Sequence, residues 1–119
     1  MLAIEKAAHE HEPGVIVLRL SGVAGERSAE QLRKALSAAL EDAPRCVVLN
    51  LSGLRQMSSA SLGRLVAAIK RLREAGGQLV LCGARPPVSD ALRLLHLDEI
   101  VPLYPSEEEA LRALGGQRD

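Results

Sequence analysis

Hydrophobic residues occur in two patterns along this chain, as short continuous runs and as longer stretches with helical spacing. The short runs occupy residues 15–20, 46–49 and 78–82 and are rich in aliphatic residues, with Arg19 and Gln78 as their only polar members. This pattern predicts strands, and the run 46–49 has the unbroken apolar character of a strand covered on both faces. Residues 3–9, which precede a turn at 11–14, and residues 100–101 are further strand candidates.

The stretches with helical spacing predict helices between these runs. The first helix follows Ser28, which with Gln31 forms a capping-box pattern, and it ends before Pro44. The second runs from about Ser59 to Ala75, after a turn at residues 52–53. Its predicted core positions are Leu62, Leu65, Val66, Ile69 and Leu72.

Two shorter helices are predicted toward the C-terminus. Paired prolines at 86–87 open the third, and its apolar residues are Val88, Ala91, Leu92, Leu94 and Leu95. Ser106 and Glu109 form a second capping box at the start of the fourth helix. Three consecutive glutamates, residues 107–109, place negative charge at the positive end of that helix dipole.

Strands that alternate with helices predict an α/β fold with right-handed crossovers. The expected sheet is mixed and mostly parallel, with four to five strands and about four helices. The chain has 119 residues and no internal repeat or linker, so we expect residues 1–119 to form a single domain with its core at about 14–114.

Composition and charge narrow the classes of function. The chain has no formal net charge and one aromatic residue, Tyr104, which argues against a nucleic-acid partner. The apolar stretches are too short for a signal peptide or a membrane span. We therefore expect a cytoplasmic protein without direct membrane insertion. Cys46 and Cys82 both lie within apolar runs and are expected to be buried free thiols.

The order of these elements resembles the STAS family, the fold of bacterial anti-sigma factor antagonists. Residues 47–53, Val-Val-Leu-Asn-Leu-Ser-Gly, are similar to the family's strand ending in Asp-Leu-Ser-Gly. Residues 57–63, Met-Ser-Ser-Ala-Ser-Leu-Gly, are similar to its phosphorylation loop, Asp-Ser-Ser-Gly-Leu-Gly after a hydrophobic residue. The resemblance extends over about residues 15–114.

The resemblance places Ser59 on the family's phosphoacceptor serine, with Ser58 as the alternative. Three positions that carry an aspartate in antagonist-type members are occupied here by Gly25, Asn50 and Ser58. The residues themselves allow a second interpretation, because a serine at a helix start is more often only a cap.

One flank of the second predicted helix is a candidate partner-binding surface. Small residues at four-residue spacing let another backbone approach closely, and the neighbouring arginines would attract an acidic partner. The candidate partner-binding residues are Ser58, Ser59, Ala60, Gly63, Arg64, Ala67 and Arg71. The other interpretation is an ordinary solvated helix face in an alanine-rich chain.

The sequence carries no catalytic motif, and we expect neither enzymatic activity, nor a metal site, nor a cofactor. The resemblance implies an anti-sigma factor antagonist whose partner is a kinase-like anti-sigma factor and whose switch is phosphorylation of Ser59. The alternative is a constitutive STAS subunit of a larger assembly. Its partner would be an ABC transporter ATPase for lipid transport or another STAS-containing stress-signalling scaffold.

Overall fold

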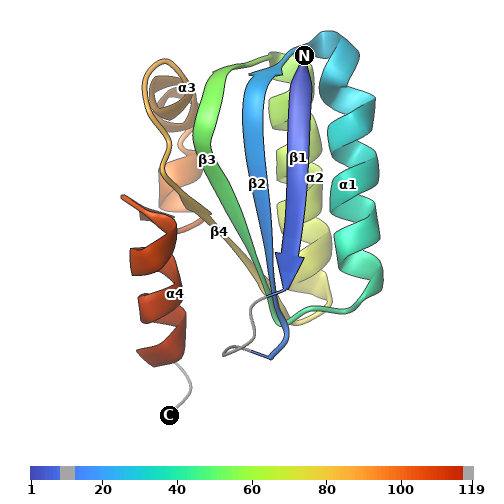
Figure 1. Cartoon of the computed structure of the whole chain (residues 1–119), viewed down its shortest axis with the longest axis vertical. Coiled ribbons are helices and arrows are strands. Elements are labelled where there is room, and N and C mark those ends of the chain that lie inside the picture. Colours follow the sequence, from blue (N-terminus) through green and yellow to red (C-terminus); the bar gives the residue numbers. More distant parts are fainter. Residues whose placement is uncertain (9–12, 117–119) are drawn as a thin grey trace.

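The computed structural model describes residues 1–8 and 13–116, within which the strands form a five-stranded mixed sheet (Figure 1). The strand order is β1-β2-β3-β4-β5. β1 pairs antiparallel with β2, and all later pairs are parallel, as expected from the alternation of strands and helices. The strands are β1 (Leu2–Ala8), β2 (Val15–Ala24), β3 (Cys46–Met57), β4 (Gln78–Cys82) and β5 (Leu103–Tyr104). The predicted turn at 11–14 lies partly outside the described residues.

Four α-helices and two short 3-10 helices accompany the strands in the described part of the chain. They are η1 (Glu26–Ser28), α1 (Ala29–Glu41), α2 (Ser59–Glu74), α3 (Val88–Leu94), η2 (Leu97–Glu99) and α4 (Glu107–Gly116). α1 and α2 lie side by side against one face of the sheet, while α4 lies on the other face (Figure 1). The predicted α/β architecture is therefore confirmed.

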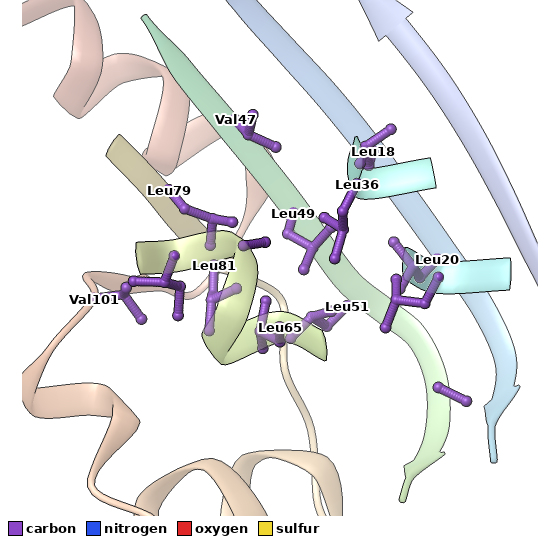
Figure 2. Packing of buried hydrophobic residues seen from close by; sticks show 14 of the residues in the cluster. Leu18, Leu20, Leu36, Val47, Leu49, Leu51, Leu65, Leu79, Leu81 and Val101 are labelled. Atoms are coloured by element: carbon purple, nitrogen blue, oxygen red, sulfur yellow. The ribbon is translucent and has the colours of Figure 1, made fainter. Parts of the chain in front are cut away.

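Alternation along the strands divides the apolar residues between the two faces. Leu18 and Leu49 point toward α1 and α2, within the main core shown in Figure 2. Val17 and Val48 point the opposite way and pack with Ala110 and Leu114 of α4. Because each central strand is covered on both faces, consecutive residues of the strand are mostly apolar.

The second and third strands are longer than predicted. β3 does not turn at residues 52–53 but continues to Met57, and its pairing with β2 shifts register twice on the way. A Cβ added to Gly53 would stand 2.7 Å from the Cβ of Ser21, so this bulged stretch needs a residue without a side chain. From the sequence alone, a glycine that allows two strands to pack closely cannot be distinguished from a glycine that ends a strand.

Three kinds of local prediction were wrong, because tertiary packing decides them. Ser28 makes no side-chain cap for α1, and Gln31 instead donates to the Leu2 carbonyl oxygen at 2.9 Å. The last strand is Leu103–Tyr104 rather than residues 100–101. Three residues assigned to apolar helix faces are exposed, namely Val66, Leu94 and Leu95.

Candidate functional site

The site predicted from the sequence lies where β3 passes into α2. Ser58 has extended backbone angles and is the N-cap of α2. Its Oγ accepts a hydrogen bond from the Ser61 N–H at 3.2 Å, and its own N–H donates to the Ala24 carbonyl oxygen at 2.7 Å. The Ser58 hydroxyl is therefore part of the structure of the helix start.

Ser59, the first residue of α2, differs from Ser58 in its surroundings. Its side chain is exposed, and its hydroxyl makes no hydrogen bond to another described residue. The first turn of α2 contains no acidic residue. Helix starts present N–H groups without intrahelical partners and the positive end of the helix dipole, so an anion on Ser59 would be stabilised there.

Ser61 is a third serine of this segment, and its role was missed in the sequence. It is fully buried, and its Oγ donates to the Gly25 carbonyl oxygen at 3.2 Å. Together with the bond from Ser58 to Ala24, this contact joins the start of α2 to the end of β2. A Ser-x-x-Ser spacing at a helix start was the available signal, but only the fold shows which backbone the second serine meets.

A hollow of about 370 Å³ opens beside this helix start. The ends of β2 and β3 form part of its wall, and α3 contributes Pro87 and Ala91. Gly25 and Ser58, two of the positions where the family carries aspartate, both line it. These two positions near Ser59 therefore carry no charge.

The third such position, Asn50, lies within β3, several residues before the strand ends at Met57. Its amide nitrogen donates to Glu107 at 3.0 Å, and its oxygen accepts from the Ser52 N–H at 2.9 Å. Asn50 therefore belongs to the surface near α4.

The predicted flank of α2 is exposed along its length. The exposed members are Ser59, Ala60, Gly63, Arg64, Ala67 and Arg71. From Ser59 to Arg71 it extends about 18 Å at the helical rise of 1.5 Å per residue. Its later half borders a groove of about 150 Å³ between α1 and α2, in which Arg71 Nη1 donates to Ser37 Oγ at 3.2 Å. The structure thus brings six of the seven predicted partner-binding residues onto one surface that also includes part of α1, whereas Ser58 is the half-buried N-cap.

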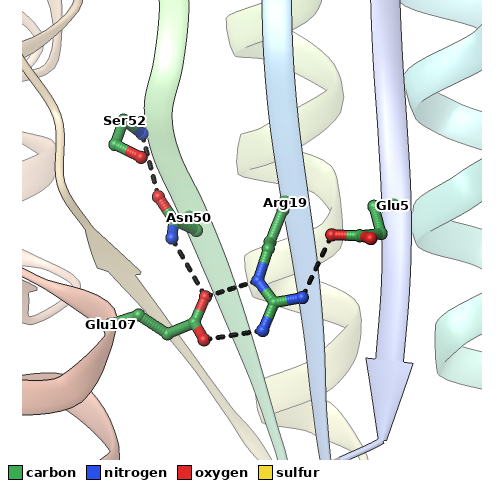
Figure 3. Close-up of polar contacts among 5 residues, drawn as sticks. All are labelled: Glu5, Arg19, Asn50, Ser52 and Glu107. Carbon is green, nitrogen blue, oxygen red and sulfur yellow. Dashed lines mark hydrogen bonds and ion pairs between the residues drawn. The ribbon is translucent and has the colours of Figure 1, made fainter.

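A second polar cluster, centred on Arg19, was not predicted from the sequence (Figure 3). The Arg19 guanidinium donates two bonds of 2.9 Å to Glu107 and one of 3.0 Å to Glu5. The hydrogen bonds that Arg19 donates to the carboxylates of Glu107 and Glu5 raise its pKa. The cluster joins residues from β1, β2, β3 and α4, so no local sequence pattern could reveal it.

The two cysteines are buried free thiols, as predicted. Burial raises the pKa of Cys46 to about 11 and that of Cys82 to about 12. Both are protonated at neutral pH, and a protonated buried thiol is a poor nucleophile. Among the described residues, no group of three or more His, Cys, Asp or Glu side chains is placed to hold a metal ion.

The mixed sheet, its helices on both faces, and a helix that starts at adjacent serines define a small α/β domain. A STAS domain model matches residues 6–110, and the chain belongs to the STAS family. No helix in the described part of the chain is long and apolar enough to cross a membrane.

Similar proteins agree with this assignment. The chain is 33% identical over 107 residues to the anti-sigma F factor antagonist of Paenibacillus polymyxa, covering 88% of this chain and 91% of that protein. It is 36% identical over 100 residues to the putative anti-sigma factor antagonist BtrV of Bordetella bronchiseptica, covering 84% and 86%. A crystal structure of an anti-sigma factor antagonist from Mycobacterium paratuberculosis superposes with a TM-score of 0.85 at 28% identity, covering 95% and 93%. The chain is a STAS-domain regulator, and these relatives are anti-sigma factor antagonists.

Proposed function

We propose that this chain is an anti-sigma factor antagonist that binds a kinase-like anti-sigma factor through the exposed flank of α2 and is released when Ser59 is phosphorylated. The observation that carries the proposal is the difference among three serines. Ser58 caps the helix and Ser61 is buried against Gly25, whereas the Ser59 hydroxyl is exposed and unbonded to the described residues. Ser59 is therefore the serine that a kinase can reach without breaking an existing contact.

The proposed docking surface has small residues, which let a partner approach the helix backbone closely, and it also has positive charge. Gly63 and Ala67 leave the helix backbone accessible to a partner, and Arg64 and Arg71 border them on the same flank. An acidic surface on the anti-sigma factor would complement these arginines and accelerate association. This interaction would take place in the cytoplasm, where sigma factors act.

Phosphorylation would change this surface without refolding the domain. In this step Ser59 Oγ attacks the γ-phosphorus of the partner's ATP. The bond to the ADP leaving group breaks and the hydroxyl proton is released, so the side chain gains a charge of about −2 at neutral pH. The N–H groups and dipole at the start of α2 stabilise that charge, while an acidic partner surface is repelled by it. The switch would thus act by local electrostatics.

A second function is favoured by one specific observation. Gly25 and Ser58, beside Ser59, are uncharged where the family's switchable members carry aspartates. A constitutive subunit needs the docking surface but not the switch. In this case the partner would be an ABC transporter ATPase or another STAS-containing scaffold.

Recovery of the tagged chain from its native cells, followed by partner identification and peptide mass mapping, tests the proposal. We expect a kinase-like anti-sigma factor, with phosphate on Ser59 in part of the population. A Ser59→Ala variant should retain the partner and lose the phosphate, whereas Arg64→Glu should lose the partner. Arg112→Glu, an equal charge change on α4, is the matched control and should behave as wild type.

Two results would overturn the switching proposal. One is stoichiometric recovery of a transporter ATPase or scaffold with unmodified Ser58 and Ser59 under all growth conditions. The other is phosphate on Ser58 alone, since that would require disruption of the helix cap. The first result would support the constitutive subunit.

A further inference from the structure

A second hollow, of about 300 Å³, lies between α3 and the segment that leads into α4. We call it the α3 hollow, and its lining includes Cys82, Ala84, Ser89, Arg93, Leu103 and Tyr104. Cys82 and Tyr104 are the last residues of β4 and β5, so the hollow lies at the carboxyl ends of two parallel strands.

An unpartnered polar side chain faces this hollow. Ser89 is only 5% exposed, yet its hydroxyl makes no hydrogen bond to any described residue. Buried hydroxyls in native proteins almost always have a partner, because an unpaired one is unfavourable. The contacts of the chain therefore leave a donor and acceptor in the hollow for a bound molecule.

Arg93 supplies the only charge among the residues that line the α3 hollow. It lies one helical turn after Ser89, is exposed, and forms no ion pair with the described residues. The nearby Glu107 carboxylate is already bound by Arg19 and Asn50. One guanidinium suits a singly charged head group, and its geometry matches the two oxygens of a carboxylate.

We propose that the α3 hollow binds a small organic carboxylate with an apolar tail. Its carboxylate pairs with Arg93 and accepts a hydrogen bond from Ser89, while its tail packs against Ala84 and Leu103. The volume of the hollow is at the lower end of the range for small-molecule sites, which limits the ligand to the size of a small metabolite. This site is separate from the proposed docking surface, so either proposal can fail alone. α3 also borders the hollow beside Ser58, which Pro87 and Ala91 line.

Tyr104 is the only aromatic residue of the chain, so its fluorescence reports on this hollow without any substitution. We would titrate the full chain with sodium hexanoate, and separately with the uncharged hexanamide, at constant ionic strength. Amide chemical shifts would be recorded in parallel. We expect saturable changes at Tyr104, Ser89 and Arg93, with a dissociation constant in the millimolar range and about fivefold weaker binding of hexanamide.

Variants then separate the anion site from a merely apolar hollow. Arg93→Gln should weaken hexanoate binding about fivefold, and Ser89→Ala about threefold. Lys34→Gln removes the same charge from α1, which contributes no residue to the lining of this hollow, and should leave binding unchanged. Ser89→Ala removes an unpartnered hydroxyl, so it should melt no lower than wild type.

Three results would overturn the proposal. They are shifts that do not saturate, equal affinity for hexanoate and hexanamide, and unchanged hexanoate affinity in Arg93→Gln. The melting temperature of each variant shows that a loss of binding reflects the site and not unfolding.

Discussion

Arg19 and Glu107 lie 88 residues apart in the chain and are joined by two parallel hydrogen bonds of 2.9 Å (Figure 3). The Nε and Nη2 groups of the arginine each donate to one oxygen of the carboxylate. Because Glu107 is the first residue of α4, this pair fixes the start of the helix over β2. The apolar residues Ala110 and Leu114 then pack on the same face of the sheet. The position of the last helix thus depends on one polar pair as well as on apolar burial.

Replacement of Glu107 by glutamine tests this relationship. The variant keeps the shape of the side chain but loses the charge-assisted bonds to Arg19. We expect the free energy of unfolding, measured by urea denaturation, to fall by about 1 kcal/mol, since Arg19 is partly exposed and the pair is screened by solvent. Glu108→Gln breaks an exposed pair with Arg112 on the same helix and should cost less than about 0.5 kcal/mol. Equal effects of the two substitutions would contradict a special role for Glu107.

Alanine substitutions at the three serines near the start of α2 should differ in their effect on the free energy of unfolding. Ser58→Ala removes the helix cap and Ser61→Ala removes the buried bond to Gly25, so each should lower the free energy of unfolding by about 1 kcal/mol. Ser59→Ala removes no contact and should change it by less than about 0.5 kcal/mol. Thermal denaturation of the three variants side by side measures this. A large loss for Ser59→Ala would mean that its hydroxyl has a structural role.

Two glycines should respond to alanine in opposite directions. Gly63 is exposed in the interior of α2, and an added Cβ would meet nothing within 4 Å, so Gly63→Ala should stabilise the chain by about 0.5–1 kcal/mol. Gly22 has a φ of +92°, and a Cβ there would stand 2.1 Å from the Met1 carbonyl oxygen. Gly22→Ala should therefore destabilise by about 2 kcal/mol or more. Urea denaturation of both variants tests the pair, and a loss of stability in Gly63→Ala would contradict the helical geometry at that position.

A substitution at Gly63 also tests the proposed docking surface, because it can change that surface without unfolding the chain. A bulkier residue there keeps the helix but obstructs the approach of a partner. We expect Gly63→Leu to remain folded, with a melting temperature no lower than wild type, and to lose the partner in a pull-down. Retention of the partner by a folded Gly63→Leu chain would exclude this flank from the interface.

The buried thiols predict a loss of stability at alkaline pH. Their pKa values are raised from an ordinary 9.0 to about 11 for Cys46 and about 12 for Cys82. The folded chain therefore retains protons that the unfolded chain releases above pH 9. The contribution to stability is fully present below pH 9 and decreases as pH rises toward 11 and 12.

A Cys46→Ala/Cys82→Ala chain removes this dependence. The wild type should lose about 1.4 kcal/mol per thiol between pH 7 and pH 10, beyond the change seen in the double variant. Urea denaturation of both chains at each pH gives their free energies of unfolding. Subtracting one from the other removes the contributions of the lysines and the tyrosine, which titrate in both chains. Parallel pH profiles would show that the thiols are accessible to water in the folded state.

Much of the fold follows from patterns that are local in the sequence. The unbroken apolar runs at 46–49 and 79–82 identify strands that are covered on both faces, and the three- and four-residue spacing of apolar residues after Ser59 identifies α2. The helix start at Ser58–Ser59 could also be predicted, because capping depends on residues only three apart. The extent of a strand could not, since Gly53 serves a contact with Ser21 in a neighbouring strand.

The sequence alone therefore determined the class of fold, the helix that carries the candidate serines, and the small and basic residues along its flank. Only the tertiary structure decided which serine remains free, that Asn50 faces Glu107 instead of Ser59, and that Ser89 and Arg93 share a hollow with Tyr104. The physical reason is the range of the interactions. Periodicity and capping act between residues a few positions apart, whereas these contacts join residues that approach one another only when the sheet has formed and both of its faces are covered.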